Sequence, residues 1–337
     1  MKALRANTAT ELFALACDHL RAEGVETHRG TTRMIEAPGP VTLTLDCPEQ
    51  HMVLDPVRRI NPWVSLAEFP WMIAGRNDVA WLRWYLPRAI EFSDNGKNWR
   101  AAYGPRLRRY GGAPSMMGDQ LLHITDELRK PGLSRRAVAT LWIPGTDWVA
   151  DSFDYPCTNW LSFQHRPGSM DVDLTVAMRS NDLWWGWSGV NVVNWSLLLE
   201  AVCEWSGGLA AGAYHHVADN LHVYADRHGA ALQEVGTFSP DITLDVNRFR
   251  GGMREFTVAA MGALHDIEAR RGVTAGALYP EPEREGDWLS DWAFFMGLHG
   301  LRDQPDELLA AMTRGFGSRR YDWQRAAMQW ALKGEWK

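Results

Sequence analysis

The chain has few cysteines, no excess of basic charge and no long apolar run. Its four cysteines form no CxxC pair and no zinc-type group, which argues against a disulfide framework and indicates reduced thiols. A formal net charge of −6 argues against general attraction to nucleic acid, although a local basic pocket is compatible with it. No segment approaches the roughly 18 apolar residues of a membrane span, and the N-terminus lacks the apolar centre of a signal peptide. We therefore expect a cytoplasmic protein that binds neither nucleic acid nor membrane.

What the chain does have is apolar material for a sizeable core, since 46% of its 337 residues are hydrophobic. Its 18 tryptophans are expected mostly in the core or in pocket walls. Hydrophobic periodicity predicts helices at 8–23, 65–86 (two, broken near Gly75) and 194–209. Alternation predicts strands at 41–47, 152–165 and 169–180, and a strand or strand-to-helix turn at 220–228.

After about Pro240 the pattern becomes helical, with stretches at 253–272, 287–301 and 307–316 around a Pro/Glu-rich segment. The expected fold class is therefore α+β, a mixed sheet covered by helices. The expected division is a catalytic domain at 1–239 and a helical C-terminal extension at 240–337.

Cys157 follows Tyr155-Pro156 at the start of a predicted strand. A lone cysteine is ordinarily a buried structural residue, but arginines accompany this one. Arg135 and Arg136 precede it, and Arg179 follows at the end of the next predicted strand. If these side chains converge, the guanidinium groups would lower the pKa of the thiol and bind a phosphate together.

Two other interpretations are weaker. The pair His215-His216 has no carboxylate or cysteine at ligand spacing, so no metal site is predicted. His222 together with Cys157 could suggest a cysteine hydrolase, but no oxyanion site and no Asn or Asp to orient the histidine is evident.

Eight ordered motifs, RGTT, AEFPWMIAG, AYG, SRR, PC, RSND, GVN and LHVY, resemble the thymidylate synthase superfamily. The resemblance runs from about Arg29 to about His228. It implies a thymidylate synthase-like fold, with the C-terminal helices as an extension outside it. The motifs are closest to the branch that hydroxymethylates pyrimidine nucleotides.

The resemblance also assigns roles in the chemistry. Cys157 matches the nucleophile that attacks C6 of the pyrimidine, and Tyr103 matches the tyrosine beside it. Glu68 matches the glutamate that moves protons at the base through ordered water. Asn191 matches the residue that reads the base at N3 and position 4. Without the resemblance, Glu68 would be taken for a solvated charge on a helix and Tyr103 for a core aromatic.

The remaining assignments concern binding. Arg29, Arg179 and Ser180 match phosphate ligands, with Arg33 close to the loosely matched Arg29. Arg135 and Arg136 match a pair donated across the interface of a homodimer into the partner's phosphate site. His222 and Tyr224 match the pair that holds the sugar 3′-hydroxyl. Asp182 matches the aspartate that meets the folate pterin, and Trp71 is assigned to the folate site with a core position as the alternative.

The chemistry implied by the resemblance uses 5,10-methylenetetrahydrofolate as co-substrate and no metal. The thiolate adds to C6, and C5 then attacks the one-carbon unit of the folate. Loss of the C5 proton and elimination of tetrahydrofolate leave an exocyclic methylene. Hydride from the folate would give a methyl group, whereas water would give a hydroxymethyl group, so the outcome depends on excluding water.

Several departures favour hydroxymethylation. Thr158 stands where synthases have histidine, and Ser162 stands where they have glutamine. Phe92 and Trp99, in AIEFSDNGKNW, are the nearest equivalents of the tryptophan segment that shields the intermediate. A long helical extension ending KGEWK stands in place of the short tail that closes over the folate. The alternatives are a true thymidylate synthase and a non-catalytic nucleotide-binding relative, against which Cys157, Glu68, Arg179 and Asp182 argue.

The base is less constrained. Asn191 fits uracil on the family pattern, where the phage deoxycytidylate enzyme has aspartate, but an asparagine can turn either end of its amide toward a ligand. The segment WSGVNVVN also carries one extra residue, which makes Asn194 a second candidate reader. The motifs CTN and MRSND match the cytidylate enzyme and slightly favour CMP or dCMP over dUMP. Ribose and deoxyribose, the pathway and the role of residues 240–337 stay open.

Overall fold

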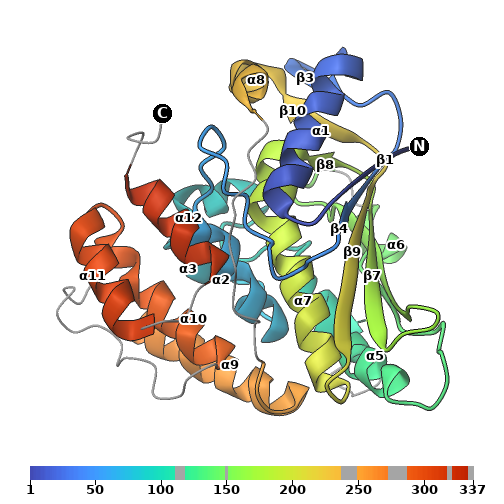
Figure 1. Ribbon diagram of the computed structural model, residues 1–337, viewed down its shortest axis with the longest axis vertical. Helices are drawn as coiled ribbons and strands as arrows, with labels where there is room; N and C mark the ends of the chain where they lie inside the picture. The colour runs from blue at the N-terminus through green and yellow to red at the C-terminus, as the bar shows by residue number, and fades with distance from the viewer. Residues whose placement is uncertain (111–117, 149–150, 237–248, 272–286, 317–320, 333–337) are drawn as a thin grey trace.

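The computed structural model describes residues 1–110, 118–148, 151–236, 249–271, 287–316 and 321–332 (Figure 1). The strands are β1 (Lys2–Ala6), β2 (Val25–Arg29), β3 (Thr32–Glu36), β4 (Val41–Leu45), β5 (Val138–Thr140), β6 (Thr158–His165), β7 (Asp171–Met178), β8 (Asn181–Asp182), β9 (Ala210–Ala218) and β10 (Leu221–Tyr224). The α-helices are α1 (Ala9–Glu23), α2 (Pro62–Ile73), α3 (Val79–Arg83), α4 (Tyr103–Arg108), α5 (Gln120–Leu128), α6 (Pro144–Asp147), α7 (Val192–Trp205), α8 (Ala225–Glu234), α9 (Met253–Ala269), α10 (Trp288–Gly297), α11 (Pro305–Phe316) and α12 (Asp322–Ala331). Short 3₁₀ segments are η1 (Pro87–Phe92) and η6 (Leu298–Leu301), and η4 (Leu183–Asn191) is a π-helix.

The larger sheet is mixed, with strand order β1-β4-β9-β7-β6-β5. Its two faces differ because side chains alternate along each strand. In β7, Val172, Leu174, Val176 and Met178 are buried, while the residues between them are partly exposed. Helix α7 packs on β7 and β9, and α1 packs on β1 and β4.

Helix α7 lies between this sheet and α2, and every one of its residues except Glu204 is buried (Figure 1). A helix that is apolar on all sides is stable only inside a layered core. Helix α2 begins at Pro62, and the Asn61 side chain caps it by accepting from the backbone N–H groups of Trp63 and Val64. Through α7, helix α2 is held on the buried side of the larger sheet.

The smaller sheet has the order β2-β3-β10-β8. Strand β8 is only two residues long and runs parallel to β10, with Asp182 beside His222. The backbone N–H of Asn181 donates to Asn220 O (2.8 Å), which anchors β8 at this edge. The RSND and LHVY motifs are therefore brought together by direct strand pairing.

The C-terminal helices pack on the outer side of α2. The Trp63 indole donates to Phe295 O (3.1 Å) and stacks on the Phe295 ring. Asp322 of α12 accepts from the backbone N–H of Met52 (2.6 Å). The buried side chains of α9–α12 belong to the same hydrophobic cluster as those of α2 and α7. The predicted boundary at 239/240 and the KGEWK end lie outside the described residues, and the division into two domains stays a prediction.

The α+β class with C-terminal helices is confirmed, as are the predicted helices α1, α2 and α7 and the pair β6–β7. Gly75 and Gly168 have positive φ angles (69° and 81°), as the predicted break and turn require. The prediction omitted β9, which lies at the centre of the sheet. Its sequence AAGAYHHVA has weak strand propensity, and pairing with β4 and β7 decides its conformation. None of the described helices combines the length and the apolarity needed to span a membrane.

Candidate active site

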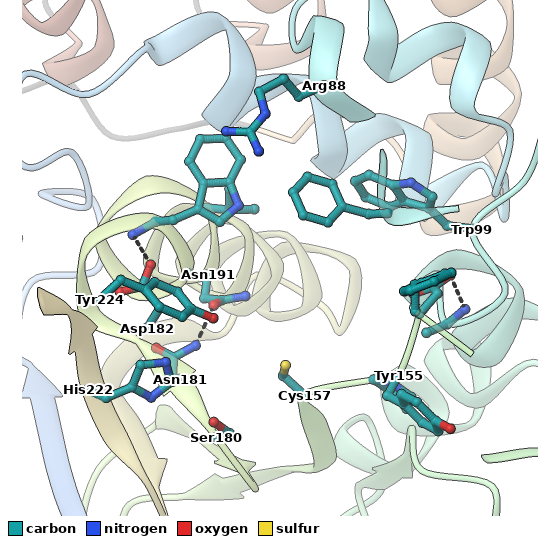
Figure 2. A pocket seen from close by; sticks show the side chains of 18 of the residues that line it. Arg88, Trp99, Tyr155, Cys157, Ser180, Asn181, Asp182, Asn191, His222 and Tyr224 are labelled. Carbon is teal, nitrogen blue, oxygen red and sulfur yellow. Dashed lines mark hydrogen bonds between the residues drawn. The ribbon is translucent and has the colours of Figure 1, made fainter. Parts of the chain in front are cut away.

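A cavity of about 1040 Å³ opens where α2, η4, β10 and the start of β6 meet (Figure 2). The cavity is lined by most of the side chains that the sequence nominated: Glu68, Trp71, Tyr103, Cys157, Arg179, Ser180, Asp182, Asn191, His222 and Tyr224. Figure 2 shows the sulfur of Cys157 pointing into this space, between Asn191 on one side and Tyr155 on the other. Residues from widely separated parts of the chain therefore converge on one thiol.

Cys157 and Arg179 are neighbours because β6 and β7 are antiparallel. The Arg179 backbone N–H donates to Cys157 O (3.0 Å), and its guanidinium Nη2 lies 3.9 Å from the sulfur. Arg179 lowers the pKa of the thiol, but burial raises it by more, and the net shift is upward. We expected the arginines to lower this pKa. Among the described residues Arg179 is the one cation that lowers this pKa, and its effect is smaller than that of the loss of water, to which Asp154 adds a further upward influence.

Tyr103 supports the nucleophile from the opposite side. Its hydroxyl accepts the backbone N–H of Thr158, the residue after Cys157 (3.3 Å), and its ring packs against Trp195. Burial raises the pKa of the Tyr103 phenol far above its usual range. The hydroxyl therefore keeps its proton and remains a donor toward the cavity.

Glu68 has a proton affinity suited to exchange at neutral pH. Burial raises the pKa of its carboxyl to about 7, against the opposing effect of a hydrogen bond from Asn194 Nδ2 (3.0 Å). A carboxyl with this pKa is present in both protonation states near neutrality, which is the property of a general acid–base group. Asn194, a candidate base reader in the sequence, is 2% exposed and lies beneath Glu68 rather than in the cavity lining.

The π-helix η4 contains the first part of the segment WSGVNVVN, for which the sequence analysis predicts one extra residue. A π-helix holds one more residue per turn than an α-helix, so it can absorb an insertion without moving its ends. Asp182 caps its start by accepting from the backbone N–H groups of Trp184 and Trp185 (3.1 and 2.8 Å). The half-buried Arg58 side chain donates to Trp184 O and Ser188 Oγ (2.8 and 2.7 Å), a support that no motif had indicated. Asn191 is held at the far end of η4, facing the cavity.

His222 and Tyr224 lie together on β10, with ring centroids 5.3 Å apart. Burial lowers the pKa of His222, and its Nδ1–H donates a hydrogen bond to Asn220 Oδ1 (2.8 Å). The lowered pKa favours the uncharged ring at neutral pH, and because Nδ1 carries the hydrogen, Nε2 is left to accept a hydrogen bond from a ligand. Ser180 lies within 3.5 Å of the same Asn220 oxygen.

Three predicted arginines are not brought to the cavity. Arg29 pairs with Glu36 (3.2 Å) on the β2–β3 hairpin, and its side chain is 67% exposed. Arg135 and Arg136 are exposed just before β5. The cavity wall instead includes Arg33, Arg88 and Arg227, which the sequence analysis had not assigned to the site. Of these, Arg33 pairs with Glu26 and Asp226, so much of its charge is already compensated.

Aromatic side chains form the outer wall of the cavity. Trp71 lines it but is almost entirely buried (2% exposed), and its indole donates to Asp78 O (3.2 Å). Trp99 packs edge-on against both Trp71 and Phe92. Phe92 is 41% exposed, and both Phe92 and Trp99 line the cavity. Within the described part of the chain, no three His, Cys, Asp or Glu side chains are grouped to hold a metal ion.

Comparison with known proteins agrees with this geometry. A family model described as thymidylate synthase matches residues 12–263. The chain is 37% identical over 201 residues to a deoxyuridylate hydroxymethyltransferase of Bacillus phage SP01, covering 58% of this chain and 52% of that protein. It is 32% identical to the enzyme of the same name from Pseudomonas phage M6, covering 67% and 62%. The chain thus spans between half and two thirds of the length of these relatives.

The solved structures add a likeness of fold. The crystal structure of thymidylate synthase from T4 phage matches with a TM-score of 0.58 at 20% identity, over 73% of this chain and 90% of that one. This supports the thymidylate synthase-like fold that the ordered motifs had implied.

Proposed function

Because the chain belongs to the thymidylate synthase family, we propose that it hydroxymethylates C5 of a pyrimidine nucleoside 5′-monophosphate, with 5,10-methylenetetrahydrofolate as one-carbon donor. The observation that carries the proposal is the convergence of Cys157, Glu68, Asn191 and Arg179 on one cavity. The names of the phage relatives support the hydroxymethyl product. The proposal therefore rests on the arrangement of side chains in the cavity and on the sequence similarity to these relatives.

The nucleotide would lie with its ring over the Cys157 sulfur. Arg179 and Ser180 would bind the phosphate, and the uncharged His222 ring with Tyr224 would bind the sugar hydroxyl. The Cys157 thiolate then bonds to C6, and the electron pair of the C5–C6 double bond moves toward C5.

Glu68 would manage the protons of the later steps. After the one-carbon unit is attached, the pyrimidine must lose its C5 proton and tetrahydrofolate must leave, which gives an exocyclic methylene. Water must then add to this methylene, and the C6–S bond to Cys157 must break as the C5–C6 double bond re-forms. A carboxyl with a pKa of about 7, held by Asn194, can pass protons in both directions at neutral pH. The folate supplies the one-carbon unit, and the aromatic wall of Phe92, Trp99 and Trp185 suits a planar ring system.

Water access favours hydroxymethylation over methylation. The sequence has Thr158 and Ser162 where synthases have histidine and glutamine, and Phe92 in the cavity lining is 41% exposed. A true thymidylate synthase is the second candidate, supported by the family match. For the base, the relatives' names favour dUMP, whereas CTN and MRSND favour CMP or dCMP.

Product analysis tests the proposal. The protein is incubated with methylenetetrahydrofolate and CMP, dCMP, UMP or dUMP, and the product masses are measured by mass spectrometry. We expect one nucleotide to gain one carbon, two hydrogens and one oxygen, with no dihydrofolate formed. A gain without oxygen, together with dihydrofolate, would make the protein a synthase. The Cys157→Ala variant should form neither product, and full turnover by that variant would refute the mechanism.

A further inference from the structure

We propose that Asn181 is a specificity-determining residue, which fixes the direction of the Asn191 amide and so decides which pyrimidine the cavity accepts. The inference rests on the proposed function, in which Asn191 reads the base at N3 and position 4. It concerns a residue that does not itself need to touch the base. Asn181 lies in β8, between the phosphate-site residue Ser180 and Asp182.

The first step is the pairing of the two amides. Asn181 Nδ2 donates to Asn191 Oδ1 at 2.8 Å (Figure 2). An amide has one accepting and one donating end. With its oxygen held by Asn181, Asn191 turns its nitrogen toward the cavity, on the side that faces Cys157 in Figure 2.

The second step is what fixes Asn181 itself. Its Nδ2 also lies 3.2 Å from Met178 Sδ, at the end of β7. A thioether sulfur is a weak acceptor and never a donor. If the Asn181 amide were turned over, its oxygen would face the sulfur, acceptor against acceptor. Met178, which is 1% exposed, therefore selects the orientation of Asn181, and Asn181 selects that of Asn191.

The third step is the enclosure of the pair. Asn181 is 3% exposed, and its Oδ1 is buried with no hydrogen-bond partner among the described residues. Gly186 of η4 covers both amides, because a Cβ at that position would lie 2.9 Å from Asn181 Nδ2 and 3.3 Å from Asn191 Oδ1. A buried polar atom without a partner is unfavourable for stability. The presence of asparagine at position 181 is therefore better explained by the hydrogen bond from its nitrogen to Asn191 Oδ1.

The preferred pyrimidine follows from the hydrogen-bonding group that each base carries at position 4. An N–H group at position 4 matches the carbonyl oxygen of uracil and opposes the amino group of cytosine. An amide oxygen at the same place has the reverse preference. The arrangement Met178–Asn181–Asn191 therefore presents the donor that suits uracil, and an aspartate at position 181, which only accepts when ionised, would reverse the Asn191 amide.

The test compares uracil and cytosine nucleotides in the same protein. Dissociation constants for dUMP and dCMP are measured by calorimetry at pH 8, alongside product formation by mass spectrometry. We expect the wild type to prefer dUMP. Asn181→Leu, which has similar volume but no amide, should reduce the preference at least tenfold, and Asn181→Asp should shift it toward dCMP. Met178→Leu, which leaves both amides in place, should reduce it by a smaller factor.

Asn220→Leu is the matched control. It perturbs Ser180 and His222 in the same cavity without touching the amide pair, so it should weaken both nucleotides equally. If Asn181 merely filled space, its replacement would also weaken both nucleotides equally. Unchanged ratios of the dUMP and dCMP dissociation constants in the Asn181 and Met178 variants would therefore overturn the inference. Nucleotide binding without any one-carbon product would instead refute the proposed function and leave the inference standing. A wild type that binds neither nucleotide would remove both.

Discussion

The Cys157 thiol is subject to two opposing influences, burial that raises its pKa and Arg179 that lowers it. Because burial is the larger, we expect the thiol of the free protein to ionise above its ordinary value of 9.0. Alkylation of Cys157 by iodoacetamide should therefore still accelerate with pH beyond that value. In Arg179→Gln the profile should move to higher pH, since the lowering influence is removed.

Peptide mass spectrometry after timed alkylation gives the profile for each cysteine. Cys47 serves as an internal control, because burial and Glu49 raise its pKa and Arg179 does not contribute. An unchanged Cys157 profile in Arg179→Gln would mean that the 3.9 Å contact has no electrostatic effect on the thiol.

Glu68 makes the stability of the fold depend on pH. The folded protein keeps the Glu68 proton up to about pH 7, whereas the unfolded chain releases it near the ordinary value of 4.5. Between these values the folded state binds more protons, so the contribution of Glu68 to the free energy of unfolding falls as pH rises. Glu68→Gln has no such dependence and should become more stable than the wild type, by on the order of 3 kcal/mol above pH 7.

Urea unfolding at pH 4.5 to 8 measures this difference for the two proteins. Glutamine keeps an oxygen that accepts the Asn194 hydrogen bond, so packing changes little. It has no titratable proton to exchange with the substrate. Product formation by Glu68→Gln should fall about a hundredfold or more. A stability difference that does not change with pH would show that Glu68 is not buried enough to hold its proton.

Helix α2, which carries Glu68, depends on a residue far along the chain. Pro70 has no N–H, so the carbonyl of Leu66, four residues earlier, lacks its helical donor. The indole of Trp292 in α10 donates to that carbonyl at 3.0 Å. The C-terminal helices therefore complete the hydrogen bonding of the catalytic helix, in addition to covering it.

Trp292→Phe should reveal this contribution. The variant keeps most of the ring packing but leaves a buried carbonyl unpaired, with an expected loss of about 1–3 kcal/mol beyond the loss in packing. Trp288→Phe is the matched control, because Trp288 is equally buried in α10 and its Nε1 has no hydrogen-bond partner in the described part of the chain. Equal losses of unfolding free energy in urea would mean that the hydrogen bond contributes nothing.

At the scale of the whole molecule, the larger sheet has one face on which the alternate side chains of β7 are partly exposed. The predicted homodimer would bury this face, and Arg135 and Arg136, exposed beside β5, would reach the partner's phosphate site. We expect Cys157→Ala and the double variant Arg135→Ala/Arg136→Ala each to be nearly inactive. Mixing the two after reversible dissociation should restore about a quarter of wild-type activity, because half the dimers are mixed and each has one complete site.

The mixing experiment distinguishes the two arrangements directly. If the arginines act within their own subunit, every site in a mixed dimer lacks either the thiol or the arginines, and no activity returns. Light scattering on the wild type supplies the control, since an active monomer would remove the basis of the assignment.

The sequence by itself predicted the fold class, the main helices and most of the cavity. The fold class and the helices follow from short-range patterns, such as alternation in β7 and apolar periodicity in α7. The cavity residues follow from the resemblance carried by the ordered motifs around Cys157. It did not predict β9, whose conformation depends on its neighbours in the sheet.

Only the tertiary structure decided how strongly each site residue is perturbed and supported. The pKa values of Cys157 and Glu68 depend on how much water the packed core removes, and the Asn181–Asn191 bond depends on how β8 and η4 place the two side chains. The donor from Trp292 to α2 joins residues more than two hundred positions apart. Burial, amide orientation and long-range hydrogen bonds are properties of three-dimensional neighbours, and a one-dimensional pattern contains no direct record of them.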